Sequence, residues 1–96
     1  MELYFTVTNT TNETQIITFR SGQRYDYVLY KDGELIEHFS EGKMFIMIYE
    51  ELPIKPGESM DFLIPLKDLE KGNYKFTIWL ADGNWPTLRK TIEFKI

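Results

Sequence analysis

The sequence contains no cysteine and only one histidine, His38, among its 96 residues. The lack of cysteine excludes disulfide bridges, thiolate nucleophiles and the zinc or iron–sulfur sites that depend on cysteine ligands. One histidine and scattered carboxylates, with no D-x-D-x-D-G loop, also provide no ligand cluster for a metal ion. The sequence therefore predicts a protein without metal or cofactor, whose stability comes from the burial of apolar side chains.

Positive charge and long apolar runs are also scarce. Lys and Arg number 11 against 15 Asp and Glu, which gives a net charge of -4 with the basic residues scattered along the chain. Nucleic acid is therefore a poor partner, because its binding depends on clustered cations. No apolar run approaches the ~18 residues of a membrane helix, and the first residues lack the basic and apolar regions of a secretory signal. We expect a cytoplasmic protein that binds neither membranes nor nucleic acid.

The composition is that of an ordinary folded domain. Hydrophobic residues make up 43% of the chain and aromatic residues 16%. A chain of this length has room for a single hydrophobic core, because larger proteins divide into units of about 100–150 residues. We therefore predict one domain that spans residues 1–96.

Apolar and polar residues alternate along most of the chain, with the period of two that is typical of strands. Gly, Pro, Asn and Asp interrupt the alternation at intervals that suit short strands. The expected strands are residues 3–8, 17–20, 25–31, 34–39, 44–49, 60–66, 74–80 and 88–96. The inward residues of the last two are Tyr74, Phe76, Ile78, Leu80, Leu88, Ile92, Phe94 and Ile96. The run 44–49 differs from the others, because it is apolar without a clear single face.

These patterns predict an all-β fold. Short strands without helical crossovers pair antiparallel, and two such sheets packed face to face form an immunoglobulin-like sandwich. We predict an immunoglobulin-like antiparallel β-sandwich of seven to eight strands, with an eight-stranded barrel as the alternative. Residues 69–74 also resemble a tyrosine corner, in which the Tyr74 hydroxyl bonds to the upstream backbone.

The strand order suggests which loops lie together. If successive strands alternate in direction, one end of the sandwich holds residues 10–14, 32–33, 51–57 and 82–86, and the other end holds residues 21–24, 40–43 and 67–73. The first end would bring Leu52, Ile54 and Trp85 into one apolar surface that could contact a partner. In the alternative interpretation, Trp85 folds back and covers the core.

A second candidate surface is the outer face of the sheet. Val28, Tyr30 and Trp79 would point away from the core, and neighbouring large apolar residues can form a docking or dimer patch. The alkyl parts of Arg89 and Lys31 could instead cover them.

His38 is the only residue that suggests catalysis. A hydrolytic role would need a nucleophile and a carboxylate beside the imidazole. No nucleophile motif accompanies it, so we interpret His38 as an outward polar residue of a strand and expect no enzymatic activity.

Several segments together resemble the BsuPI-type family of bacterial intracellular proteinase inhibitors. The most specific is the S-G-Q-x-Y-D motif, formed by Ser21, Gly22, Gln23, Tyr25 and Asp26. Further matches are D-G at 32–33 and P-G-E at 56–58. The sequence departs from the family at Glu37 and Phe39, where the family tends to have tryptophan.

The resemblance implies an intracellular inhibitor of a subtilisin-type serine protease, which acts through surface loops without catalysis. We expect it to be a monomer or weak homodimer. For the contact surface we predict Leu52, Ile54, Lys55 and Trp85, because the prolines around this segment hold it extended. Gln23 and Arg24 would lie at an exposed edge.

The motif also has a structural interpretation. In that interpretation Gln23 and Asp26 bond to backbone groups, and Tyr25 and Tyr27 enter the core. The alternative function is a non-inhibitory immunoglobulin-like module that docks or dimerises through its sheet face.

Overall fold

The computed structural model covers residues 1–96 and contains eight strands and no helix. The strands are β1 (Glu2–Thr8), β2 (Gln15–Phe19), β3 (Tyr25–Lys31), β4 (Glu34–His38), β5 (Glu50–Ile54), β6 (Ser59–Pro65), β7 (Asn73–Leu80) and β8 (Arg89–Lys95). With no helix present, none is long and apolar enough to cross a membrane. The predicted all-β class is confirmed.

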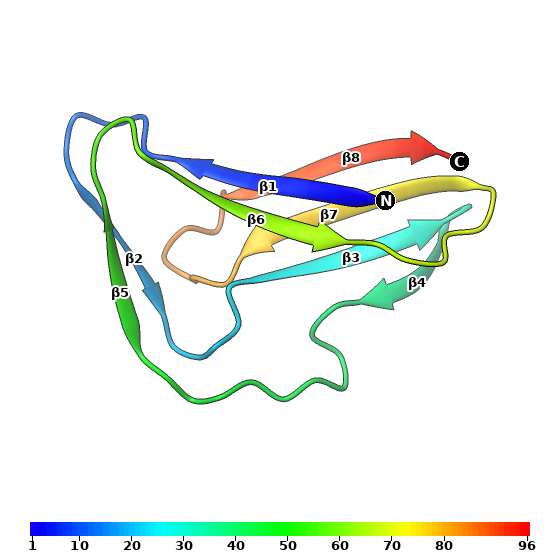
Figure 1. Cartoon of the computed structure of the whole chain (residues 1–96), viewed down its shortest axis with the longest axis horizontal. Helices are drawn as coiled ribbons and strands as arrows, with labels where there is room; N and C mark the ends of the chain where they lie inside the picture. Colours follow the sequence, from blue (N-terminus) through cyan, green and yellow to red (C-terminus); the bar gives the residue numbers. More distant parts are fainter.

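The strands form antiparallel sheets in two layers (Figure 1). One layer is the four-stranded sheet β4-β3-β7-β8, and the other consists of the pairs β1-β6 and β2-β5. Side chains from both layers meet in one core of 13 buried hydrophobic residues. The core includes Phe5 and Ile64 from the paired strands and Leu29 and Phe76 from the four-stranded sheet. This arrangement is a β-sandwich.

The alternation of β7 matches the sequence prediction. Tyr74, Phe76, Ile78 and Leu80 are all buried. In β8, Ile92 and Phe94 are half-buried against the core, as expected, but Ile96 is exposed. The prediction for Ile96 was wrong because this residue lies past the end of β8, where only its backbone is held, through bonds with Gly72 at the rim of the sandwich.

The prediction of a tyrosine corner is confirmed. The Tyr74 hydroxyl donates to the Glu70 carbonyl at 2.5 Å. The Tyr74 ring also stacks on Phe94, with ring centroids 5.2 Å apart. The corner therefore fixes the loop before β7 to the core.

A sharp bend at Asn9 divides the second layer into its two strand pairs. Asn9 is buried, and its side-chain amide donates to the carbonyls of Ile54 and Glu13, each at 2.8 Å. Its backbone N–H donates to the Glu58 carbonyl, and its carbonyl accepts from Gly57. Gly57 has a φ of 82°, in the left-handed region that favours glycine. The pairs β1-β6 and β2-β5 are thus successive halves of one bent ribbon.

Because of this bend, two of the predicted loop positions were wrong. In Figure 1, β2 runs downward and slightly to the right and β3 runs to the right, so the chain does not reverse its direction between them. Asp32 lies beside Asn73, to whose carbonyl its N–H donates at 2.8 Å, and not with residues 10–14. Arg24 likewise lies beside Ala81, at the opposite end of β7.

The fifth strand also lies later in the chain than predicted. Residues 44–49 form no strand, and β5 is instead Glu50–Ile54. Pro53 is tolerated because β5 pairs with β2 alone and leaves its other edge free. The segment around Leu52 and Ile54, which we expected to be a stiff loop, is therefore a paired strand.

We expect Asn9→Ala to lower the free energy of unfolding by about 1–3 kcal/mol, because the buried carbonyl of Ile54 loses its donor. Urea denaturation would measure the change. The exposed neighbour Asn12 provides a matched control, and Asn12→Ala should change stability by no more than about 0.5 kcal/mol. Equal effects of the two substitutions would contradict the role assigned to Asn9.

Candidate functional site

The most exposed apolar side chains of the molecule lie in the connection between β4 and β5. We call residues 44–49 the apolar loop. Met44 is 98% exposed, Met47 87% and Ile46 76%. In Figure 1 the connection runs along the bottom edge of the molecule, away from β1 and β8. A contiguous run of large apolar residues in water is unfavourable unless another molecule covers it, so it indicates an interaction site.

The backbone of the apolar loop is almost free of partners. Its single backbone–backbone hydrogen bond joins the Ile46 carbonyl to the Gly22 N–H at 2.8 Å. A Cβ added at Gly22 would lie 3.4 Å from the Ile46 side chain, so Gly22 and Ile46 are close neighbours. The other peptide groups of the loop remain available to an external strand or peptide.

The connection is fixed at its beginning by a buried carboxylate. Asp26 accepts the Ser40 N–H at 3.1 Å and the Ser40 hydroxyl at 2.7 Å. The same carboxylate lies 3.1 Å from His38 Nε2 and accepts the Tyr27 N–H. Because Asp26 is 8% exposed, water competes little for these bonds, and Ser40 is held firmly.

An aromatic stack supports the middle of the connection. The Phe39 ring lies 5.0 Å from Tyr25, 5.1 Å from Tyr27 and 6.2 Å from Phe45, measured between ring centroids. The Lys43 ammonium lies 3.6 Å from the centre of the Phe39 ring. Met44 thus stands between two neighbours that both contact Phe39, and its own side chain points into solvent.

The end of the connection is fixed by charged and aromatic groups. The Tyr49 hydroxyl donates to Glu51 at 2.6 Å, and the Arg20 guanidinium lies 5.8 Å from the Tyr49 ring. Arg24 pairs with Glu50 at 2.6 Å and lies over Phe19. The loop is therefore held at both ends and at one central carbonyl while its side chains stay exposed.

The residues of the S-G-Q-x-Y-D motif form the support of this loop. Gly22 holds Ile46, Asp26 holds Ser40, and Tyr25 contacts Phe39. The expected bonds of Gln23 and Asp26 to the backbone are confirmed: the Gln23 amide donates to the Tyr25 carbonyl at 3.0 Å. Tyr27 enters the core as expected, and Tyr25 packs against the core while remaining half-buried.

Arg24 does not lie at an exposed edge as predicted. It is half-buried, because its guanidinium packs on Phe19 and pairs with Glu50. Gln23 is also half-buried. These residues position the chain around the loop and do not project toward a partner.

The predicted contact surface is largely internal. Ile54 is 4% exposed and belongs to the core, so the prediction that it is an exposed anchor was wrong. Trp85 lines the same cavity as Ile54, but it folds back against the core, as the alternative interpretation expected. Leu52 lines a second hollow, which it shares with Pro53 and Ile54 but not with Trp85, and Lys55 is exposed next to Ile54 in the sequence. Burial follows from the pairing of β5, which turns alternate side chains inward.

Ser40, His38 and Asp26 form a cluster with the residue types of a hydrolase triad, but its geometry differs. In a triad the carboxylate and the hydroxyl contact opposite nitrogens of the imidazole. Here Asp26 and Ser40 both approach Nε2, at 3.1 and 3.3 Å, and the hydroxyl donates directly to the carboxylate. This cluster fixes the loop. His38 is a strand residue on the outer face, as expected, since it ends β4 opposite Val28 and lies near Trp79, and it is half-buried there by its contact with Asp26.

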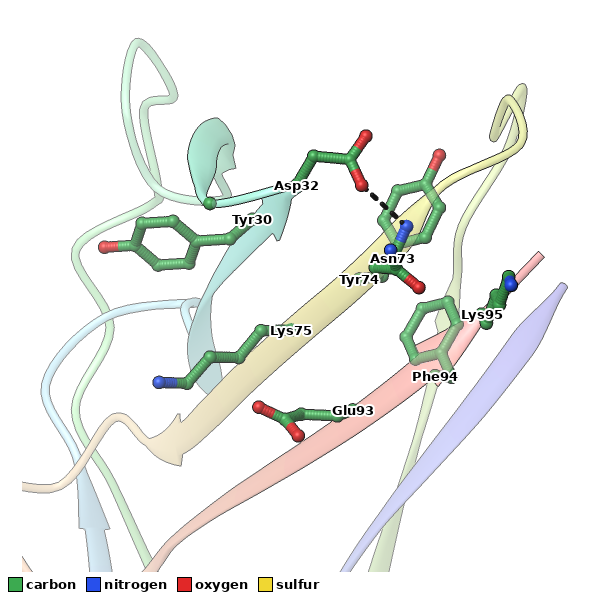
Figure 2. Close-up of a pocket in the computed structure, with 9 residues that line it drawn as sticks. Tyr30, Asp32, Asn73, Tyr74, Lys75, Glu93, Phe94 and Lys95 are labelled. Atoms are coloured by element: carbon green, nitrogen blue, oxygen red, sulfur yellow. Dashed lines mark hydrogen bonds between the residues drawn. The ribbon is translucent and has the colours of Figure 1, made fainter.

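No other cluster of the molecule offers clear chemistry. No group of three or more His, Asp or Glu side chains could hold a metal ion. Figure 2 shows a wide hollow at the far end of the four-stranded sheet, where Asp32 accepts from the Asn73 N–H and the side chains of Lys75 and Glu93 extend from neighbouring strands. Its lining mixes charges of both signs without a convergent set of polar groups.

The outer face of the sheet is partly covered. Val28, Tyr30 and Trp79 are all half-buried, and the Arg89 guanidinium lies 5.2 Å from the centre of the Trp79 ring. Lys31 does not contribute to this cover, because its ammonium pairs with Glu70 at 3.4 Å.

The sequence analysis missed the apolar loop as a functional segment. Period-two alternation assigns one face of a strand to water, and residues 44–49 have no such alternation. This missing alternation, together with the two methionines, was the only available signal. A continuous apolar run is also typical of a fully buried strand, so the pattern alone could not place it at the surface.

A comparison with protein families identifies the type of protein. The family model described as BsuPI, intracellular proteinase inhibitor, matches residues 1–85. The match includes the S-G-Q-x-Y-D motif and the whole apolar loop, and it confirms the resemblance inferred from the sequence. No curated protein matches the chain significantly.

We expect Phe45→Ala to raise amide hydrogen exchange at Gly22 by about tenfold or more, because the Gly22 N–H donates to the Ile46 carbonyl and the loop that carries this carbonyl loses its contact with Phe39. Exchange followed by mass spectrometry would measure this. Met44→Ala is the matched control, since the adjacent side chain makes no such contact and should leave exchange unchanged. Exchange that is equally slow in both variants would contradict the anchoring role of Phe45.

The support of the loop should weaken at alkaline pH. Burial, with Glu37 nearby, raises the pKa of the Tyr27 phenol well above its usual value of 10.0, and burial also raises the pKa of Tyr25. The folded protein keeps the Tyr27 proton at a pH where the unfolded chain releases it, so this stability is complete below about pH 10 and is lost as the pH rises further.

Urea denaturation at about pH 8 and about pH 11 would test this. The free energy of unfolding should fall less between these two values in Tyr27→Phe than in the wild-type protein. A parallel fall in both proteins would argue against a Tyr27 contribution.

Proposed function

This chain belongs to the BsuPI family of intracellular proteinase inhibitors, and from that premise we propose that it inhibits a subtilisin-type serine protease by placing the apolar loop in the active-site cleft. The observation that carries the proposal is the combination of exposure and fixation in residues 44–49. Met44 and Met47 are nearly fully exposed, while the Ile46 carbonyl, Ser40 and Tyr49 are bonded to the sandwich.

Free backbone groups suit the loop for a protease cleft. Proteases bind substrates and inhibitors as extended chains, through backbone hydrogen bonds supplemented by pockets for side chains. Within residues 44–49 only the Ile46 carbonyl bonds to another backbone group of this chain. The remaining N–H and C=O groups are free to pair with the edge of a cleft.

Fixation before binding favours tight inhibition. A flexible peptide must be ordered when it binds, and each immobilised side chain costs about 0.5–1.5 kcal/mol. Here the Phe39 stack and the Asp26–Ser40 bonds hold the loop in the free protein. Less of the binding free energy is then lost to ordering.

The side chains indicate a cleft with apolar pockets. Methionine is flexible and polarisable, so it adapts to irregular apolar pockets. Met44, Ile46 and Met47 carry no charge, and the charged Lys43 and Glu41 lie to one side of them in the sequence. A protease that prefers large uncharged side chains fits this surface better than one that requires a basic residue.

We further propose that the protein acts in the cytoplasm as a monomer or weak homodimer and catalyses no reaction. The sandwich is immunoglobulin-like in this proposal, which the Tyr74 corner supports. Docking through the sheet face is the weaker alternative, because Arg89 covers Trp79 there.

The test is inhibition of a purified subtilisin-type protease by the wild-type protein and by Met44→Asp and Met47→Asp. We expect each substitution to weaken inhibition about tenfold or more, which corresponds to ~1.4 kcal/mol per decade, because a carboxylate would be buried in an apolar pocket. Inhibition constants measured with a small chromogenic substrate would show the change.

The matched control is Tyr4→Asp, which alters an exposed aromatic residue of β1, on the opposite side of the view in Figure 1. This variant should inhibit as the wild type does. Unchanged inhibition by both methionine variants would exclude the apolar loop, and a wild-type protein that inhibits cysteine or metalloproteases but no serine protease would exclude the proposed target class.

A further inference from the structure

We propose that Met44 and Met47 are sites of reversible oxidation, and that their conversion to methionine sulfoxide by a peroxide switches off the apolar loop. The effect on inhibition rests on the proposed function, whereas the modification itself follows from the exposure of the two thioethers. The structure thus assigns a redox control to the same surface that contacts the protease.

The four methionines of the chain differ widely in exposure. Met44 is 98% exposed and Met47 87%, whereas Met1 is 55% exposed and Met60 is half-buried against the core. Oxidation requires contact between the peroxide and the sulfur, so accessible thioethers react first. The most reactive pair therefore lies within one loop, three positions apart.

The reaction is a two-electron oxidation of sulfur. Hydrogen peroxide, or an organic peroxide, transfers one oxygen atom to the thioether: the O–O bond breaks, the S–O bond forms, and the second oxygen leaves as water or as the alcohol. The product is polar and chiral in place of a flexible apolar side chain. A sulfoxide oxygen in an apolar pocket lacks a hydrogen-bond donor, so the oxidised loop binds an apolar cleft poorly.

The fold should survive this reaction. Neither sulfur belongs to the core, and the groups that fix the connection are the Gly22 N–H, the Asp26 carboxylate and the aromatic rings of Phe39 and Phe45. Oxidation therefore changes the surface of the loop and leaves its support in place. Because the modified side chains remain exposed, a methionine sulfoxide reductase can reach and restore them.

The first experiment maps oxidation in the folded protein. A time course with hydrogen peroxide, followed by proteolytic digestion and mass spectrometry, gives the rate at which each methionine gains one oxygen. We expect Met44 and Met47 to react at least about tenfold faster than Met60, with Met1 between them. Rates at Met44 and Met47 that are equal to or below the rate at Met60 would overturn the proposed modification sites.

The second experiment measures inhibition of a subtilisin-type protease before and after oxidation. The oxidised wild-type protein should inhibit at least about tenfold less well, and treatment with methionine sulfoxide reductases should restore inhibition. Thermal unfolding followed by circular dichroism should show the same transition in the oxidised and untreated proteins. Undiminished inhibition after complete oxidation of both residues would overturn the switch.

Two variants separate the switch from other damage. The double variant Met44→Leu with Met47→Leu should have the same inhibition constant before and after peroxide, whatever its absolute value. Met60→Leu should stay as sensitive as the wild type. A double variant that loses inhibition like the wild type would assign the effect to another residue. If the untreated wild-type protein inhibits no protease, the proposed function fails, while the mapping experiment still decides whether Met44 and Met47 are the reactive sites.

Discussion

The packing of one aromatic ring, Phe39, connects the core of the protein to its most exposed segment. The ring contacts Tyr25 and Tyr27, and Tyr27 belongs to the buried core. The ring also contacts Phe45 and the Lys43 ammonium, which belong to the connection before β5. Without this ring, the centre of the connection would depend on the hydrogen bond between the Gly22 N–H and the Ile46 carbonyl.

Apolar side chains occupy two opposite environments in this protein, the buried core and the exposed apolar loop, and the exposed loop is the candidate site. Thirteen hydrophobic residues are removed from water in the core, which provides the main driving force for folding. The apolar loop keeps equally large side chains in water, where they contribute nothing to stability. Departures from the pattern that stabilises the rest of a fold are expected at functional sites. The S-G-Q-x-Y-D motif keeps the exposed loop in place, because Gly22 and Asp26 bond to the backbone of the connection and leave the side chains of Met44 and Met47 free.

Much of the fold could be predicted because the relevant signals are local. Period-two alternation identified the buried face of β7 and the inward side chains of Ile92 and Phe94 in β8, and the sequence before Tyr74 identified the corner that its hydroxyl closes. The motif could likewise be interpreted as a turn whose polar side chains bond to nearby backbone, and Gln23 does so with Tyr25. The candidate site could be predicted only in part. The sequence indicated that the motif bonds to backbone and packs on the core, but not that it supports the loop, and the contact surface it suggested around Ile54 lies in the core.

The sequence by itself determined the all-β class and most inward residues of the last two strands, because these properties depend on the order of apolar and polar residues along the chain, and its composition excluded cysteine chemistry. Only the tertiary structure decided which apolar segment pairs in a sheet and which lies at the surface. The bend at Asn9 is made by bonds to Ile54 and Glu58, residues far along the chain, and it changes the direction of β2 relative to β3. With β5 paired to β2, residues 50–54 fill the place in the sheet that the run 44–49 was expected to take, and that run is left outside. Local periodicity carries no information about such long-range pairing, and for that reason the exposure of Met44 and Met47 follows from the fold and not from the pattern.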